Sequence, residues 1–301
     1  MVSDVKRFKE AKLLHKNGEI TKAIKIYLKL LKFEKENFEI NLLLGTAYLQ
    51  CEIYKKSIDY LTQAIKIKES PAAYNNIGLA FLKTKKYDEA IKNFKNSIEL
   101  DSSFFQAYNN LGIVFRELRK FNDAIEHFKN ANKINKYYYE SFNNIGNTYK
   151  DLGNFKKSVE NYKKAIFLNN NYADAYFNLG VIYQENNNYD EAKNCYLKVK
   201  KIDQNFNYID GKILHNNMNL CSWDNFKKNL DQIDMLIENK KKIIEMEIKK
   251  TGKLFSFCCF APGQIAGRNK NENKKLSKIG EDIGLLFQLA DDFLDVKGKS
   301  K

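Results

Sequence analysis

The sequence predicts an all-α protein, a superhelical solenoid of about six helix pairs followed by capping helices and a second helical segment. Three sets of positions predict this fold. A glycine returns every 33 or 34 residues, a small residue follows it twelve positions later, and a bulky residue comes four positions after that. A fixed period of this length is typical of stacked helical units, none of which buries its apolar face alone. The first set is Ala11, Gly45, Gly78, Gly112, Gly146 and Gly180; the second is Ala23, Ser57, Ala90, Ala124, Ser158 and Ala192; the third is Tyr27, Leu61, Phe94, Phe128, Tyr162 and Tyr196.

Each unit is expected to be a pair of antiparallel helices that approach closely. Bulky residues surround Gly78 at helical intervals. Glycine inside a helix costs about 1 kcal/mol relative to alanine, so its recurrence needs a steric reason. We therefore expect Ala90 to lie against Gly78, with Phe81 and Phe94 filling the space on either side.

The turn within such a unit is predicted at residues 85–88, with Asp88 as the N-cap of the second helix. The whole pattern resembles the tetratricopeptide repeat (TPR) family over residues 5–205. Tyr-Asn-Asn-Leu-Gly at 108–112, for example, agrees with the family signature, although Pro71 is the one family-type proline at a unit boundary. The resemblance implies six TPR units at residues 1–205, whose first helices line a concave groove.

Composition narrows the range of partners. The formal net charge is +14, but lysines are spread along the chain and arginine is scarce, so we expect solvated faces and no nucleic-acid partner. Runs of eighteen or more apolar residues are absent from the sequence, which predicts no membrane span, and the N-terminus lacks an apolar secretion signal. Five cysteines without paired spacing favour reduced thiols in a cytoplasmic protein.

An asparagine recurs two residues before the glycine of four units. Stacked once per unit on the concave side, these amides could donate hydrogen bonds to, and accept them from, an extended peptide backbone. We therefore expect a protein or peptide ligand in the groove and no cofactor for the TPR region. The alternative is that asparagine is simply common at this place in TPR units. The candidate peptide-binding residues are Asn76, Asn110, Asn144 and Asn178.

Residues 206–243 are expected to form a helical cap and linker that covers the last unit. Around His215, Cys221 and Trp223 this segment resembles the stretch that joins TPR units to the catalytic region of bacterial O-linked N-acetylglucosamine transferase-like proteins. Nothing after residue 242 resembles a glycosyltransferase domain. One interpretation of the chain is therefore a remnant of a glycosyltransferase targeting arm.

Residues 244–301 resemble the trans-prenyltransferases that synthesise farnesyl and geranylgeranyl diphosphate. The resemblance rests on Lys-Thr-Gly at 250–252, Gly-Leu-Leu-Phe-Gln at 284–288 and Asp-Asp-x-x-Asp at 291–295. Carboxylate oxygens suit Mg²⁺ bound together with substrate phosphates. The resemblance implies Mg²⁺ ligands and diphosphate contacts for a prenyl diphosphate, the former at Asp291, Asp292 and Asp295 and the latter at Lys250, Thr251 and Gln288.

The first aspartate-rich motif of that family is absent from the sequence, and the resemblance covers only part of the family's catalytic domain. Orienting two diphosphates needs both motifs, so we expect a truncated segment that is inactive on its own. The favoured function is a protein-binding or peptide-binding TPR scaffold rather than an enzyme. The alternative is a prenyltransferase of isoprenoid biosynthesis that binds Mg²⁺-diphosphate through this segment.

Overall fold

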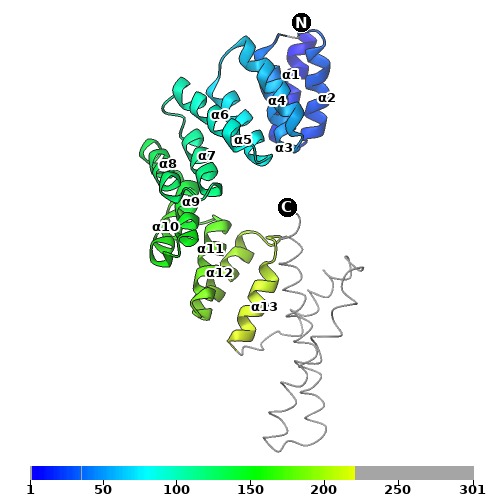
Figure 1. The fold of residues 1–301 in the computed structure, drawn as a ribbon. Helices are drawn as coiled ribbons and strands as arrows, with labels where there is room; N and C mark the ends of the chain where they lie inside the picture. Colours follow the sequence, from blue (N-terminus) through cyan, green and yellow to red (C-terminus); the bar gives the residue numbers. More distant parts are fainter. Residues whose placement is uncertain (1, 35, 221–301) are drawn as a thin grey trace, which may run out of the picture. The chain divides into compact units, whose positions relative to one another are not determined.

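The computed structural model describes residues 2–34 and 36–220, which form α-helices joined by short turns (Figure 1). One compact unit ends at Asn178 and a second begins at Leu179. The all-α prediction is confirmed. The helices are α1 Val2–Lys16, α2 Ile20–Leu31, α3 Phe38–Gln50, α4 Tyr54–Ile67, α5 Pro71–Lys83, α6 Tyr87–Leu100, α7 Phe105–Glu117, α8 Phe121–Ile134, α9 Tyr139–Asp151, α10 Phe155–Leu168, α11 Ala173–Glu185, α12 Tyr189–Ile202 and α13 Ile209–Asn219.

The turn inside each helix pair is a Schellman motif. The residue seven positions after the repeat glycine has a positive φ in each case, including Lys85 and Arg119 at 58°. The next N–H then bonds back across the turn, as from Lys86 to the Phe81 carbonyl at 2.9 Å. The predicted N-cap at Asp88 was wrong, because the reversal at Lys85 lets α6 begin at Tyr87 with Lys86 as N-cap. Asp88 lies in the first helical turn, where a negative charge favours the helix dipole.

A bulky side chain from the second helix covers the glycine of the first. A Cβ placed on Gly78 would stand 2.6 Å from the Phe94 ring, so the site admits no larger residue without movement. The expectation that Phe94 flanks this contact was wrong, since the ring lies directly on the glycine. The small residue of the second set lies close by as well, because the Ser158 hydroxyl donates to the Gly146 carbonyl at 2.8 Å. The same contact pairs Gly45 with Leu61, Gly112 with Phe128, Gly146 with Tyr162 and Gly180 with Tyr196.

Within the first unit, the odd-numbered helices form a continuous row. Besides packing on its even-numbered neighbours, α3 contacts α5, α5 contacts α7, and α7 contacts α9. A residue at one position of these helices is therefore next to its equivalents one repeat earlier and one repeat later. This row is the surface on which the predicted asparagines lie.

In the second unit, α13 packs on α12. Lys200 of α12 and Asp210 of α13 form an ion pair at 2.6 Å, and the fully buried Asn216 donates to the Tyr189 carbonyl at 2.5 Å. This helix lies in the segment predicted to cap the last repeat, while the rest of that segment, from residue 221, lies outside the described residues. None of the helices in residues 2–34 and 36–220 has the length and apolarity needed to cross a membrane.

Candidate functional site

The four predicted asparagines lie half-buried on successive odd-numbered helices and bond to the preceding repeat. Asn110 donates from Nδ2 to Asn75 Oδ1 at 2.8 Å, and Asn144 donates in the same way to Asn109 at 2.9 Å. Asn178 repeats the bond with Asn143 at 3.0 Å, and Asn76 donates to Thr46 Oγ1 at 3.1 Å. The structure therefore brings all four residues into one chain of inter-repeat contacts. We call Asn76, Asn110, Asn144 and Asn178 the asparagine row.

The acceptors of these bonds form a second, buried row that the sequence analysis missed. Asn75, Asn109 and Asn143 are at most 6 % exposed. Each is the first residue of an Asn-Asn doublet, so the signal was present in the sequence, but the pairing between doublets of different repeats is visible only in the fold. A buried amide without a partner costs about 1–3 kcal/mol, so the asparagine row also stabilises the stacking of the repeats.

The inter-repeat bonds fix which atom each amide of the row presents. Nδ2 is held by the preceding repeat, and the Oδ1 atoms of Asn110, Asn144 and Asn178 accept no hydrogen bond from any residue that the structure describes. In Asn76, by contrast, Oδ1 accepts from Asn75 Nδ2 at 3.3 Å. Three oriented carbonyl oxygens, one per repeat, are therefore available as acceptors.

Aliphatic and ionic groups continue the face on which the row lies. Leu79 and Ile113, three residues after Asn76 and Asn110, are half-buried. Towards the C-terminal ends of these helices, the Arg116 guanidinium bonds Asp151 of the next repeat at 3.2 Å and lies 4.0 Å from Glu117. The face thus combines amide acceptors and apolar side chains. At the C-terminal ends of the helices it also carries carboxylates that interact with Arg116.

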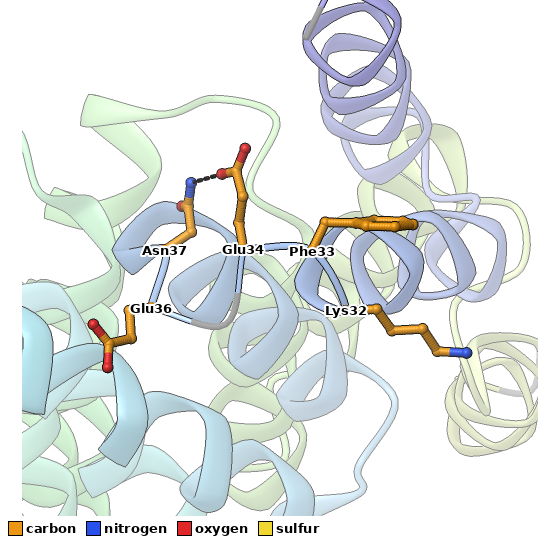
Figure 2. Close-up of a pocket in the computed structure, with 5 residues that line it drawn as sticks. All are labelled: Lys32, Phe33, Glu34, Glu36 and Asn37. Carbon is orange, nitrogen blue, oxygen red and sulfur yellow. Dashed lines mark hydrogen bonds between the residues drawn. The ribbon is translucent and has the colours of Figure 1, made fainter.

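A shallow depression lies beside the segment that joins α2 and α3 (Figure 2). Figure 2 shows its lining, in which Glu34 accepts a hydrogen bond from Asn37 at 2.8 Å while the Phe33 and Lys32 side chains extend along the same segment. All the lining residues, Lys32, Phe33, Glu34, Glu36 and Asn37, come from this one connection. No second element closes the depression, and we assign no site to it.

The predicted metal and diphosphate residues, all between Lys250 and Asp295, lie outside the described residues. Within residues 2–34 and 36–220, no three His, Cys, Asp or Glu side chains gather closely enough to hold a metal ion. His215 is in α13, whereas Cys221 and Trp223 are not described.

Stacked helix pairs with a shared polar row define a helical repeat protein. Family models described as tetratricopeptide repeat match residues 38–71, 71–104, 105–138 and 173–206, and a further TPR repeat model matches residues 146–187. A model described as polyprenyl synthetase matches residues 214–301, beginning before residue 244 and inside α13. The chain therefore belongs to the tetratricopeptide repeat proteins, and its residues 214–301 are similar to polyprenyl synthetases.

Curated relatives match each part separately. BBSome complex member BBS4 of Bos taurus is 30 % identical over 27 % of this chain and 22 % of its own length. Farnesyl diphosphate synthase of Micrococcus luteus is 36 % identical over 22 % of this chain and 24 % of its own length. The chain thus spans less than a quarter of either relative. A solved structure of pilF from Pseudomonas aeruginosa has a TM-score of 0.58 at 18 % identity, covering 66 % of this chain and 91 % of that chain, which shows a shared fold.

Proposed function

We propose that the repeats bind an extended protein segment through the asparagine row. The observation that carries this proposal is the orientation of Asn110, Asn144 and Asn178, whose Nδ2 atoms are fixed by the preceding repeat while their Oδ1 atoms accept no bond from the described residues. A peptide N–H is a suitable donor for such an oxygen. Because the contacts involve backbone groups, the row would accept many sequences.

The repeat spacing suits an extended chain. Packed helices lie about 8–10 Å apart, and an extended peptide advances about 3.3 Å per residue. One backbone contact would therefore fall about every third residue, and the three asparagines with available oxygens would engage a segment of about nine residues. Leu79 and Ile113, which lie half-buried on the same face, would contact apolar side chains of that segment.

The rival explanation is that the asparagines only hold the repeats together. Two double variants of the full chain separate the two explanations. N144A/N178A removes two amides of the row with their oxygens, whereas N109A/N143A keeps those amides and removes the buried acceptors that hold their Nδ2 atoms. The probe is a fluorescein-labelled peptide of about twelve residues with alternating Leu and Ser and two Gln three positions apart, which we call the neutral peptide.

We expect N144A/N178A to weaken binding of the neutral peptide roughly thirtyfold, since two hydrogen bonds contribute about 1 kcal/mol each. N109A/N143A should lower stability by a similar amount and weaken binding less than N144A/N178A does, because the oxygens remain although the preceding repeat no longer orients them. Thermal melts followed by circular dichroism report the stability of both variants. Equal loss of binding in the two variants, or no binding to the original chain, would contradict the proposal.

We propose a second function for residues 214–301, namely binding of Mg²⁺-diphosphate of the kind carried by prenyl substrates in isoprenoid biosynthesis. The polyprenyl synthetase match and the similarity to farnesyl diphosphate synthase support it. The carboxylates of Asp291, Asp292 and Asp295 would supply Mg²⁺ ligands, and Lys250, Thr251 and Gln288 would contact the diphosphate.

Calorimetric titration of the full chain with geranyl diphosphate, with and without Mg²⁺, tests this second function. The proposal expects binding that requires Mg²⁺ and is lost in Asp291→Asn. Heat that is independent of Mg²⁺, or unchanged in the variant, would refute it. Product formation from isopentenyl and allylic diphosphates, dependent on Asp291, would extend the function from binding to catalysis.

The compartment proposed for these functions is the cytoplasm. Cys51 and the buried Cys195 are free thiols, which suits a reducing environment. Labelling with a thiol reagent in intact cells, compared with labelling after denaturation, would test whether Cys51 is kept reduced. Extensive disulfide formation at Cys51 in cells would contradict this placement.

A further inference from the structure

Two carboxylates lie on the face that carries the asparagine row. Glu140 is in the first turn of α9, four residues before Asn144, and Asp174 is in the first turn of α11, four residues before Asn178. Residues four apart in a helix share a face. The carboxylates are therefore at the N-terminal end of the same surface, on two successive repeats.

A row of aromatic rings accompanies these carboxylates. Phe105 packs edge-to-face on Tyr138, and Tyr139 packs in the same way on Tyr172, both with ring centroids 4.8 Å apart. Burial raises the pKa of Tyr138 to about 12, with the charge of Glu140 adding to the effect. Burial, followed by the charges of Asp174 and Glu140, likewise raises the pKa of Tyr172. The carboxylates thus lie close to the rings.

Neither carboxylate has a cationic partner among the described residues. The Tyr139 hydroxyl hydrogen-bonds the Glu140 side chain, whose Oε2 atom is inaccessible to solvent and has no partner of its own. Desolvation raises the pKa of the Asp174 carboxyl, although the residue as a whole is exposed. At the other end of the same face, Asp151 is bonded to Arg116 at 3.2 Å. The helix dipole accounts for acidic residues in a first turn, but it does not account for a carboxylate oxygen buried without a partner.

We infer that the segment bound by the asparagine row is basic and places Lys or Arg side chains against Glu140 and Asp174. This inference rests on the proposed peptide binding and names the class of peptide. A cation would supply the opposite charge that both carboxylates lack among the described residues, and the adjacent rings of Tyr138, Tyr139 and Tyr172 favour a cation over other groups. The two carboxylates belong to neighbouring repeats, so the two cations would be about three residues apart in an extended segment.

The charge of the whole chain makes this local preference informative. With a formal net charge of +14, the chain as a whole attracts acidic molecules. A preference for a basic peptide could not arise from that general field and would have to come from Glu140 and Asp174. The sign of the peptide preference therefore separates the local site from non-specific attraction.

The test compares three peptides on the full chain by fluorescence anisotropy. One is the neutral peptide, and the others replace its two Gln residues with Lys or with Glu. We expect the Lys peptide to bind roughly tenfold more tightly than the Glu peptide at low ionic strength, because each partly exposed charge pair contributes up to about 1 kcal/mol. Salt should reduce the difference. In the variant E140Q/D174N, the three peptides should bind within about twofold of one another, with the neutral peptide unchanged.

Each outcome bears on a separate claim. A tighter Glu peptide, or a Lys preference that survives in E140Q/D174N, would overturn this inference while leaving backbone binding in place. Failure of all three peptides to bind would contradict the proposed function and this inference together. If the chain alone self-associates at low salt, and E140Q/D174N abolishes this, the surface belongs to a second copy of the chain and the inference is again overturned.

Discussion

The helix pairs α3–α4 and α7–α8 share one packing scheme but present different surfaces. In the first pair Leu61 covers Gly45, and in the second Phe128 covers Gly112. The positions just before the glycine are leucines in α3, at residues 42 and 43, and asparagines in α7, at residues 109 and 110. The fold therefore depends on the contact between a glycine and a bulky residue. The residues just before the glycine can be apolar or polar without a change of fold.

The difference also marks where the polar row begins. Thr46 of α3 accepts the amide of Asn76 and donates its own hydroxyl to the Leu42 carbonyl at 2.8 Å. No asparagine doublet precedes it in the described repeats. The candidate binding surface thus runs from α5 to the start of α11, and its unpaired carboxylates lie at the far end.

The largest effects should come from the shared packing. Phe128→Ala and Leu61→Ala each remove a fully buried side chain, and we expect each to lower the free energy of unfolding by about 3–4 kcal/mol. Urea denaturation of the full chain measures this. A loss below about 1 kcal/mol in only one variant would show that the two pairs do not share one packing scheme.

A smaller effect is expected where the glycine itself is replaced. A Cβ at Gly112 would stand 2.7 Å from the Phe128 ring, so Gly112→Ala should destabilise the protein by about 1–2 kcal/mol despite the better helix propensity of alanine. Gly211 in α13 is the matched control, because apart from its chain neighbours and its own helix backbone no atom lies within 4 Å of its Cβ position. Gly211→Ala should be neutral or stabilise by up to about 1 kcal/mol. Equal effects of the two substitutions would mean that packing does not select Gly112.

The polar row should contribute less to stability. Asn110→Ala leaves the buried Asn75 Oδ1 without its donor, and we expect a loss of about 1–2 kcal/mol. Amide hydrogen exchange should show the loss of protection in α5 and α7 rather than in α3. A change confined to α7 would indicate that the bond to Asn75 does not couple the two repeats.

The smallest effect is a difference in pH dependence between the two pairs. In α3–α4, Tyr48 stacks on Tyr60 with centroids 5.5 Å apart, and at the equivalent place Phe115 stacks on His127 at 5.1 Å. Burial lowers the pKa of His127, and its Nδ1 atom is buried without a partner. The unfolded state therefore binds a proton more readily, so stability should fall as the pH drops below about 6.5 and through the lowered pKa.

His127→Phe removes this titration. Urea denaturation at about pH 7 and pH 5 should show a smaller loss of stability on acidification in the variant than in the original chain. The Tyr60→Phe variant is the control, since it changes the equivalent stacked ring of the other pair without removing an imidazole. An unchanged pH slope in His127→Phe would contradict the assignment of the effect to this histidine.

The sequence period predicted the helix pairs and the positions that pack, because glycine, small and bulky residues recur at fixed spacing. It placed the turn at residues 85–88 but did not predict the left-handed conformation of Lys85, since a left-handed residue that is not glycine leaves no signal in composition. It identified Asn110 but not its acceptor Asn75, because that bond joins residues 35 positions apart. Whether a cationic side chain lies near Glu140 likewise depends on the neighbouring repeats, so it cannot be predicted from the sequence of one repeat.

Side-chain amide NMR tests the central claim most directly. The ¹⁵N–¹H signals of the asparagine amides are followed while the neutral peptide is added to the full chain, with Asn93 on the even-numbered helix α6 as an internal reference. The account predicts saturable shifts at Asn110, Asn144 and Asn178 and none at Asn93. Saturable shifts at Asn93, with those three amides unmoved, would contradict it.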